Sequence, residues 1–318
     1  MIVAVETPAA DWVRPATEAD KPMWGIQGGL QFGIYPASIT GKGKGGPRGL
    51  IRIGYPTLEG GRYDLINFIA VEPVVNGRKG FSEMENSSLD NEPGKRLWVD
   101  EASGGAGKLS RPKPDIEQLD VTIRVEKFNN GAHVFLVVSQ RSDAPDEIAL
   151  AIHAEPDSAP MERCILTATM GNRARTRLLW LRDGPVSSLK LFPDHRGDRF
   201  TRDALFDLKR LCITPRGDVI AALTTDEEDL AAVRPFPNSP AWYYGGAKVT
   251  QYWRKPKGAF RDDLHVRVNA RYTYWRSQQP IPGGVAYENF EMRERFHDGQ
   301  QFVFGVTRKT PKELTDGR

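Results

Sequence analysis

Apolar and polar residues alternate with a period of two through most of the 318-residue chain. The alternation is clearest in LDVTIRVEKF (119–128), HVFLVVSQ (133–140) and EIALAIHA (147–154). It places successive side chains on opposite faces of a strand and is typical of sheets with one face against a core. Strands do not alternate with long helices, which argues against a parallel α/β architecture. We therefore expect an all-β protein, a large antiparallel two-sheet β-sandwich with few short helices.

Turn and helix signals add detail to this expectation. The sequence Asn129-Asn130-Gly131 separates two alternating runs and predicts a β-hairpin, because Asn and Gly tolerate positive φ. The segment HDGQQF (297–302) predicts a second turn of this kind. The apolar spacing of 201–211 and the acidic start of 225–233 predict two short helices.

The chain is expected to contain one β-sandwich domain at 24–318, preceded by an N-terminal extension at 1–23. Sandwiches of this size commonly fold as one domain. The segment 76–118 lacks alternation and is far longer than an ordinary connection, so it predicts a long loop. Long loops in compact domains are often functional, although a plain surface excursion is the alternative.

The charge balance excludes some partners. The chain has 44 basic and 41 acidic residues, a net charge of +3, which is too even for a nucleic-acid-binding footprint. No apolar run reaches the roughly 18 residues of a membrane span, so we expect a soluble protein. The N-terminal residues lack the basic-then-apolar order of a signal peptide. A periplasmic or secreted location is expected only if such a peptide originally preceded them. Cys164 and Cys212 are expected to be buried free thiols, with a disulfide as the alternative.

Aromatic and basic residues gather late in the chain, where Tyr-Trp-Arg occurs at both 252–254 and 274–276. Sugar rings stack on aromatic side chains, while Arg and Gln hydrogen-bond their hydroxyls or carboxylates. The region therefore predicts a carbohydrate-binding surface on two strands paired as a hairpin through 255–263. Packing of the rings in the core is the alternative. The predicted substrate-binding residues are Trp253, Trp275, Tyr274, Gln251, Arg254, Arg276, Arg175 and Glu83.

Carboxylates near this region suggest chemistry. Glycoside hydrolysis needs one protonated and one ionised carboxyl group. Glu288 and Glu291 are predicted catalytic residues; they are three apart and so lie on opposite faces of a strand. Each could pair with a carboxylate from elsewhere, such as Glu83, Glu85 or Asp90 in the predicted long loop.

The alternative chemistry is β-elimination from a uronic acid. Tyr252 or His153 would remove the proton, while Arg254 and Gln251 neutralise the substrate carboxylate.

Two basic segments offer further hypotheses. Arg173, Arg175 and Arg177 would share a face if their segment is extended, and would then contact an anionic ligand or pair with Asp or Glu on a neighbouring strand. The segment PDHRGD (193–198) leaves a structural calcium as an alternative to the expected absence of any cofactor. The five histidines show no metal-ligand spacing, and no metal site is predicted.

Five segments together resemble a group of uncharacterised bacterial proteins: WGIQGGLQFGIYP (24–36), PRGLIRIGYP (47–56), TATMGNRARTRLLWL (167–181), VTQYWR (249–254) and PIPGGVAYENFE (280–291). In size and strand content the chain is similar to the galactose-mutarotase-like super-sandwiches of glycoside hydrolases and polysaccharide lyases. That resemblance implies carbohydrate chemistry, but no catalytic motif matches and no residue role is transferred. We expect an enzyme that cleaves glycosidic bonds, a glycoside hydrolase. The alternatives are a polysaccharide lyase acting on a uronic-acid-containing glycan and a non-catalytic carbohydrate-binding protein.

Overall fold

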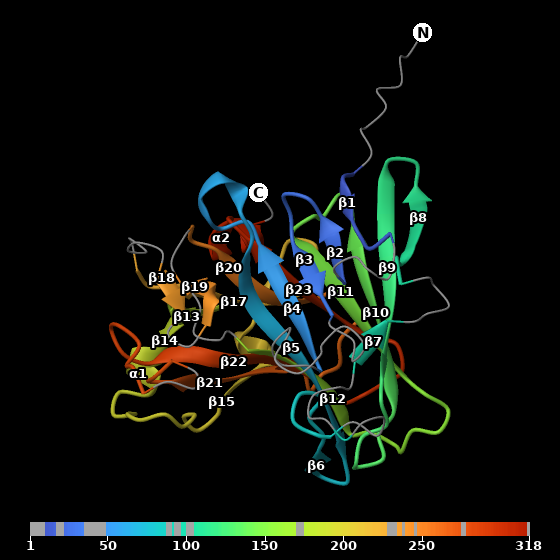
Figure 1. Cartoon of the computed structure of the whole chain (residues 1–318). Helices are drawn as coiled ribbons and strands as arrows, with labels where there is room; N and C mark the ends of the chain where they lie inside the picture. The colour runs from blue at the N-terminus through green and yellow to red at the C-terminus, as the bar shows by residue number, and fades with distance from the viewer. Residues whose placement is uncertain are drawn as a thin grey trace.

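The computed structural model confirms the all-β prediction. It describes residues 10–16, 22–34, 49–86, 91, 97–99, 105–169, 175–227, 247–274 and 278–316, together with the backbone of 234–236 and 239–244. Strands make up 51% of the model and helices 7%. Two large antiparallel sheets of ten and eleven strands form a sandwich (Figure 1).

The ten-stranded sheet, which we call sheet A, forms the first layer of the sandwich. Its strands in spatial order are β1 (Trp12–Val13), β2 (Met23–Ile26), β3 (Gln31–Gly33), β4 (Leu50–Tyr55), β5 (Asp64–Val75), β12 (Arg163–Thr169), β22 (Ala286–Arg293), β21 (His265–Arg271) and β15 (Ala204–Asp207), with β6 (Arg78–Lys79) beside β5. Strands β4 and β5 run steeply in Figure 1, whereas β22 and β21 run across the view, so the sheet is strongly twisted.

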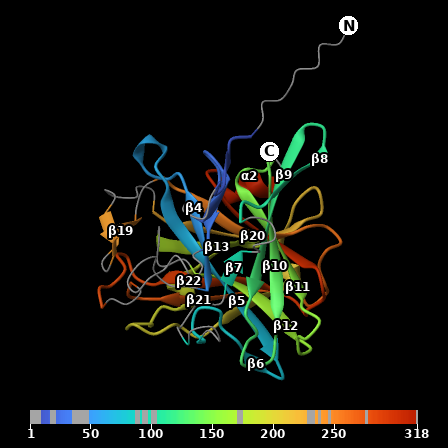
Figure 2. The same ribbon diagram turned by 45° about the vertical axis from the view of Figure 1, so that its right-hand side comes forward.

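The eleven-stranded sheet, which we call sheet B, forms the second layer. Its strands in spatial order are β14 (Gly184–Ser187), β13 (Thr176–Leu181), β17 (Val219–Thr225), β20 (Thr250–Lys255), β23 (Gln300–Thr307), β11 (Glu147–Ala154), β10 (Val134–Arg141), β9 (Ile116–Val125) and β7 (Leu97–Val99), with β16 (Cys212–Ile213) beside β17 and β8 (Lys108–Lys113) beside β9. Figure 2 shows β9, β10 and β11 side by side in this layer. A separate pair contains β18 (Arg234–Phe236) and β19 (Ser239–Tyr244).

Helical segments are few and short. Among the described residues, the α-helices are α1 (Ser188–Leu191) and α2 (Pro311–Asp316), and 3₁₀ turns lie at Glu59–Gly61 and Leu208–Arg210. No helix among the described residues is long and apolar enough to cross a membrane.

The core fills the space between the sheets. On β10, Val134, Leu136 and Val138 are fully buried, while the alternate residues are only half-buried. One continuous hydrophobic cluster joins Trp24 near the start of sheet A to Val306 on sheet B. The period-two pattern therefore separates inward from outward residues as predicted.

Some predicted connections are confirmed and others are wrong. The turn at 129–131 does join β9 and β10 as an antiparallel hairpin. The segment 255–263, however, links β20 in sheet B to β21 in sheet A, so the two Tyr-Trp-Arg segments do not form a hairpin. The turn at 297–302 likewise passes from β22 in sheet A to β23 in sheet B. A turn signal shows that the chain reverses but not which sheet receives the next strand.

Three element predictions also need correction. The segment 201–211 forms β15 and a 3₁₀ turn instead of a helix, because β15 extends the edge of sheet A beside β21 and buries Phe206. The predicted loop at 76–118 contains β6, β7, β8 and the start of β9. Within the expected N-terminal extension, β1 pairs with β2 and Trp12 packs against the core. For the predicted helix at 225–233, residues 228–233 lie outside the described residues.

Candidate functional site

A tight hairpin turn folds the start of the predicted long loop back onto sheet A. Asn76 (φ 49°) and Gly77 (φ 71°) both have positive φ, which two-residue hairpin turns require. The Gly77 N–H donates to the Glu162 carboxylate over 2.7 Å. Lys79 therefore lies opposite Val74 on β5. This reversal brings the side chain of Lys79 to Glu72.

The next residues run back along β5 and carry Glu83 to the same place. Ser82 is fully buried; its N–H donates to the Val71 carbonyl (3.1 Å), and its hydroxyl accepts from the Val71 N–H (3.0 Å). The same hydroxyl donates to the Gly49 carbonyl. These contacts fix the backbone of the segment that carries Glu83 beside β5.

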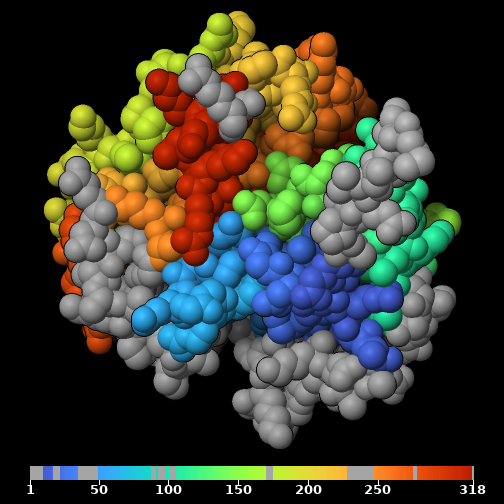
Figure 3. Space-filling model, turned by 90° about the horizontal axis from the view of Figure 1, so that it is seen from above, coloured from blue at the N-terminus to red at the C-terminus, as the bar shows by residue number. Residues whose placement is uncertain are grey.

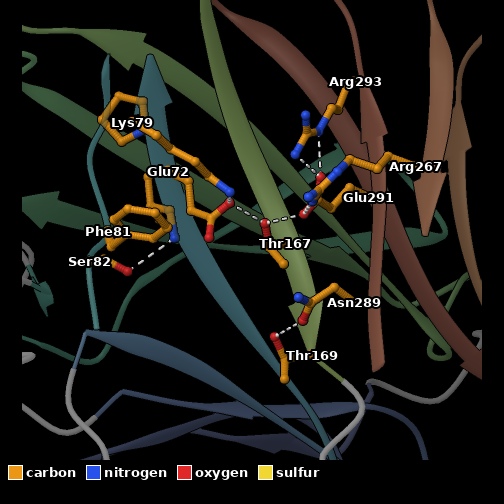
Figure 4. Close-up of polar contacts among 12 residues, drawn as sticks. Glu72, Lys79, Phe81, Ser82, Thr167, Thr169, Arg267, Asn289, Glu291 and Arg293 are labelled. Atoms are coloured by element: carbon orange, nitrogen blue, oxygen red, sulfur yellow. Dashed lines mark hydrogen bonds and ion pairs between the residues drawn. The ribbon is translucent and has the colours of Figure 1, made fainter. Parts of the chain in front are cut away.

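Three neighbouring strands contribute the centre of this polar cluster (Figure 4). Thr167 on β12 has Glu291 of β22 as its register partner, and Ile165 on β12 has Glu72 of β5. The Thr167 hydroxyl lies 2.5 Å from Glu72 Oε2 and 3.0 Å from Glu291 Oε1. Lys79 Nζ forms an ion pair with the same Glu72 oxygen. Glu72 and Glu291 are thus linked through one hydroxyl.

Two arginines surround Glu291. Arg267 donates to Glu291 Oε1 over 2.8 Å, and Arg293 bonds to Glu291 Oε2. Arg267 also pairs with Asp203. Glu291 is completely buried, so both of its oxygens are used inside the protein. Buried charges need such partners, which makes Glu291 an internal anchor of the cluster.

Burial and like charge raise the pKa of two carboxyl groups here. Burial raises the pKa of Glu72, and the charge of Glu291 adds to the rise, while Lys79 opposes it. Burial, followed by the neighbouring charge of Glu72, raises the pKa of Glu83 to about 7. Two adjacent carboxyl groups resist ionising together, so at neutral pH the pair retains a proton for part of the time.

The raised pKa of Glu83 predicts a pH dependence of stability. The folded protein holds this proton up to about pH 7, while an unfolded Glu releases it near 4.5, so this carboxyl makes folding less favourable as the pH rises between these values. Glu83→Gln should reduce the fall in the free energy of unfolding over this pH range by up to about 3 kcal/mol. Urea denaturation of both proteins at a series of pH values measures the difference. The exposed Glu59→Gln variant serves as the control, and an unchanged pH slope in Glu83→Gln would contradict the assignment.

The structure links Glu291 to Glu72 through Thr167 and places Glu83 near enough to Glu72 for their charges to interact, but it changes the predicted geometry of β22. Tyr287 and Phe290 are three apart, yet both lie in the core. A register shift between Val268 and Ala270 of β21 accommodates this, so β22 bulges at Glu288 and Asn289. Strict alternation therefore does not place Glu288 and Glu291 on opposite faces. Glu288 is completely buried.

Two predicted sugar-binding residues of the first Tyr-Trp-Arg segment lie between the sheets. Trp253 has no exposed surface; its indole N–H donates to the Phe290 carbonyl (2.9 Å), and its ring packs edge-on against Phe304. Gln251 is also fully buried and accepts a 2.8 Å hydrogen bond from Asn67 of sheet A. Both side chains are core residues in this structure and are not available to a ligand. The prediction of a stacking surface at Trp253 is wrong.

Tyr252 and Arg254 lie on the opposite, outer face of sheet B. They line a cavity of about 550 Å³ bounded by the β10–β11 turn, the 214–218 turn and α2. Figure 3 shows the end of the sandwich, where the C-terminal segment (red) and the β10–β11 turn (light green) lie side by side. The Tyr252 hydroxyl donates to Glu147 (2.9 Å), and Arg254 pairs with Glu147 and with Asp218 (2.9 Å). The protein itself therefore satisfies these side chains.

The structure does not bring together the residues that were predicted to carry out β-elimination. Burial and the adjacent Glu147 raise the pKa of Tyr252 well above its ordinary value, which is unfavourable for a base. His153 lies six residues along β11 from Glu147, about 20 Å away at the rise of a strand. Its ring stacks on Phe135 with centroids 4.9 Å apart. Because Gln251 also points into the core, these side chains cannot contact one substrate together.

Arg175 and Arg177 pair with acidic residues of the protein, which was the alternative to binding an anionic ligand. Arg175 (φ 47°) pairs with Glu227 over 2.6 Å, and Arg177 pairs with Asp226 (2.9 Å) and Glu227 (3.2 Å). Acidic residues after β17 thus neutralise both guanidinium groups.

The other predicted residues near the end of β21 are only partly described. Tyr274 is buried, and its N–H donates to the Gln279 carbonyl (3.0 Å). Arg173, Trp275 and Arg276 lie outside the described residues.

Five residues of this polar cluster were not predicted from the sequence: Glu72, Lys79, Thr167, Arg267 and Arg293. A signal was present in HVRVNAR (265–271), where polar residues alternate with apolar ones, and in ENFEMRE (288–294). Both patterns predict a polar outer face on neighbouring strands. The solitary Glu72 within the apolar strand 64–75 was a further indication.

The structure also describes both cysteines and the side chains that were considered as metal ligands. Cys164 and Cys212 are free thiols, as predicted, with Cys164 buried and Cys212 half-buried. Burial raises the pKa of both thiols. Among the described residues, including Asp194, His195 and Asp198, no group of three or more His, Cys, Asp or Glu side chains is arranged to hold a metal ion.

Comparison with known proteins yields no relative: no protein-family model, curated protein or solved structure matches the chain. The candidate site is therefore judged on its own chemistry.

Proposed function

We propose that the protein is a glycoside hydrolase whose reacting carboxyl groups are Glu83 and Glu72. The observation that carries this proposal is the pKa of Glu83, about 7, beside a second carboxyl group in ion-pair contact with Lys79. Hydrolysis of a glycosidic bond requires one carboxyl group that gives a proton and one that is ionised. A group with a pKa near the working pH is suited to proton donation.

The surroundings distribute the two roles. Burial, followed by the neighbouring charge of Glu72, keeps the proton on Glu83, while the Lys79 ammonium favours the ionised form of Glu72 against the effect of its burial. Glu83 would protonate the leaving oxygen, while Glu72 would either activate water or attack the sugar carbon. Burial raises the pKa of both carboxyl groups, so the ion pair of Glu72 with Lys79 is the feature that favours Glu72 as the ionised partner.

Glu291 is a positioning residue in this proposal. It touches Thr167 and two arginines, and it is sealed from solvent. The Thr167 hydroxyl joins it to Glu72, so Glu291 holds the reacting carboxylate in place through an intermediate side chain. Half-buried polar residues nearby, Thr169 and Asn289, hydrogen-bond each other over 3.0 Å and offer groups that suit sugar hydroxyls.

The galactose-mutarotase-like relationship remains a prediction beside this proposal. The two-sheet architecture agrees with it, although architecture alone does not specify an activity.

Incubation of the purified protein with a panel of neutral and uronate-containing polysaccharides tests the proposal. We expect new reducing ends without the ultraviolet absorbance of an unsaturated uronate. That absorbance would show a lyase instead, and binding without turnover would show a carbohydrate-binding protein. Glu83→Gln, prepared in the same way, controls for contaminating hydrolases.

A further inference from the structure

A second cavity, of about 520 Å³, lies beyond the end of β21. Its inner wall consists of the buried side chains of Phe192, Ile281 and Val285. Tyr272 and Arg196 also line it. The described residues of the proposed hydrolase site are not among its lining residues, so it is a separate feature of the fold.

The cavity wall is held in place by the protein. Arg177 bonds to the Pro282 carbonyl and contacts the Gly284 carbonyl (3.4 Å), and the Ile281 N–H donates to the Tyr272 carbonyl (2.8 Å). Gly283 has a φ of 81°, a conformation that favours glycine, and its Cα lies close against the Arg177 guanidinium group. The cavity is thus preformed, as small-molecule sites usually are.

Among the described residues, Arg196 is the one cationic side chain that lines this cavity. Its Nη1 donates to the carbonyls of Pro193 (3.0 Å) and His195 (2.7 Å), and its guanidinium lies 5.1 Å from the Tyr272 ring centroid. Within the described part of the chain, no carboxylate pairs with it, and its Nε and Nη2 donate no hydrogen bond. Arg254, in the cavity on sheet B, is by contrast paired with Glu147 and Asp218.

This arrangement matches one class of ligand. The Nε–Nη2 edge of a fixed guanidinium can bind a carboxylate through two parallel hydrogen bonds. The buried side chains behind it offer apolar surface for a flat body, and no described acidic side chain lines the cavity. We propose that this cavity binds a small aromatic carboxylate, with its carboxylate on Arg196 and its ring against Phe192, Ile281 and Val285.

Ligand titrations followed by NMR test the proposal with benzoate as the probe. Benzamide has the ring without the charge, and acetate has the charge without the ring. We expect benzoate to bind about 10–100-fold more tightly than either, because a hydrogen-bonded charge and an apolar contact are each lost. Equal affinity for benzamide would refute the role of Arg196, and equal affinity for acetate would refute the apolar wall. Tighter binding of glucuronate would overturn the aromatic assignment in favour of a sugar acid.

Variants locate the site. Arg196→Gln should weaken benzoate binding about 10–100-fold, whereas Arg199→Gln, an exposed arginine of the same segment, should leave it unchanged. Tyr272→Phe keeps the ring that holds the guanidinium and should retain affinity, while Tyr272→Leu should lose it. Unchanged benzoate binding in Arg196→Gln would overturn the proposal. These titrations measure binding alone, so they are independent of hydrolase activity.

Discussion

Trp253→Ala is expected to lower the free energy of unfolding by about 3–5 kcal/mol. The side chain has no exposed surface and packs against Phe302 and Phe304 between the two sheets. Truncation removes a large buried ring, leaves a cavity and deprives the Phe290 carbonyl of its indole partner. Urea denaturation measures the loss. Leu205→Ala, at a side chain that is 64% exposed on edge strand β15, should change stability by less than about 0.5 kcal/mol.

The same variant decides between two interpretations of the Tyr-Trp-Arg segment. If Trp253 belonged to an open sugar-binding surface, its removal would weaken oligosaccharide binding and leave stability nearly unchanged. The buried position predicts the reverse: a large loss of stability, with any loss of binding explained by unfolding. A stable Trp253→Ala protein with weakened binding would refute the core assignment.

The sequence predicted the alternation within this strand but not its direction. Gln251 shares a face with Trp253, and Tyr252 shares one with Arg254, as the period of two requires. Both rows contain one aromatic and one polar residue, so hydrophobicity alone cannot tell which faces the core. The structure decides through partners: Asn67 of sheet A satisfies buried Gln251, while Glu147 on the outer face satisfies Tyr252 and Arg254.

Connectivity was the least predictable part of the fold. Turn residues at 129–131 and at 297–302 look equivalent in sequence, yet the first joins neighbouring strands and the second crosses between sheets. Both connections satisfy the local backbone preferences of Asn, Asp and Gly. The difference lies in pairing with distant strands, such as β11 with β23, which no local pattern encodes.

The candidate site was predictable in part. A carboxyl group of the 76–118 segment was expected as a possible partner for Glu291, and Glu83 of that segment does lie near enough to Glu72 for the charge of Glu72 to raise its pKa. Glu72 itself was not predicted. It is joined to Glu291 through the Thr167 hydroxyl, because β12 lies between β5 and β22. The bulge at Glu288 and Asn289 also required the register of β21, which the sequence does not supply.

Glu83→Gln is expected to lower the rate of glycoside hydrolysis about 10²–10⁴-fold, the usual contribution of a general acid. The amide keeps the size of the side chain but has no proton to donate. In the wild-type protein, kcat/KM should fall as the pH rises through about 7, because Glu83 then loses its proton. The variant should show a low rate without this basic limb. Steady-state kinetics on the substrate that the polysaccharide panel identifies measures both effects.

Control variants separate proton donation from disturbance of the cluster. Glu59→Gln removes an exposed carboxyl group and should retain the wild-type rate and pH profile. Glu83→Asp keeps a titratable group but withdraws it by one methylene, so it should retain more activity than Glu83→Gln while still showing a basic limb. Wild-type activity in Glu83→Gln would exclude this residue as the acid. A reduced rate with an unchanged basic limb would assign the titrating proton to another group, with Glu72, which shares the site and also has a raised pKa, as the next to test.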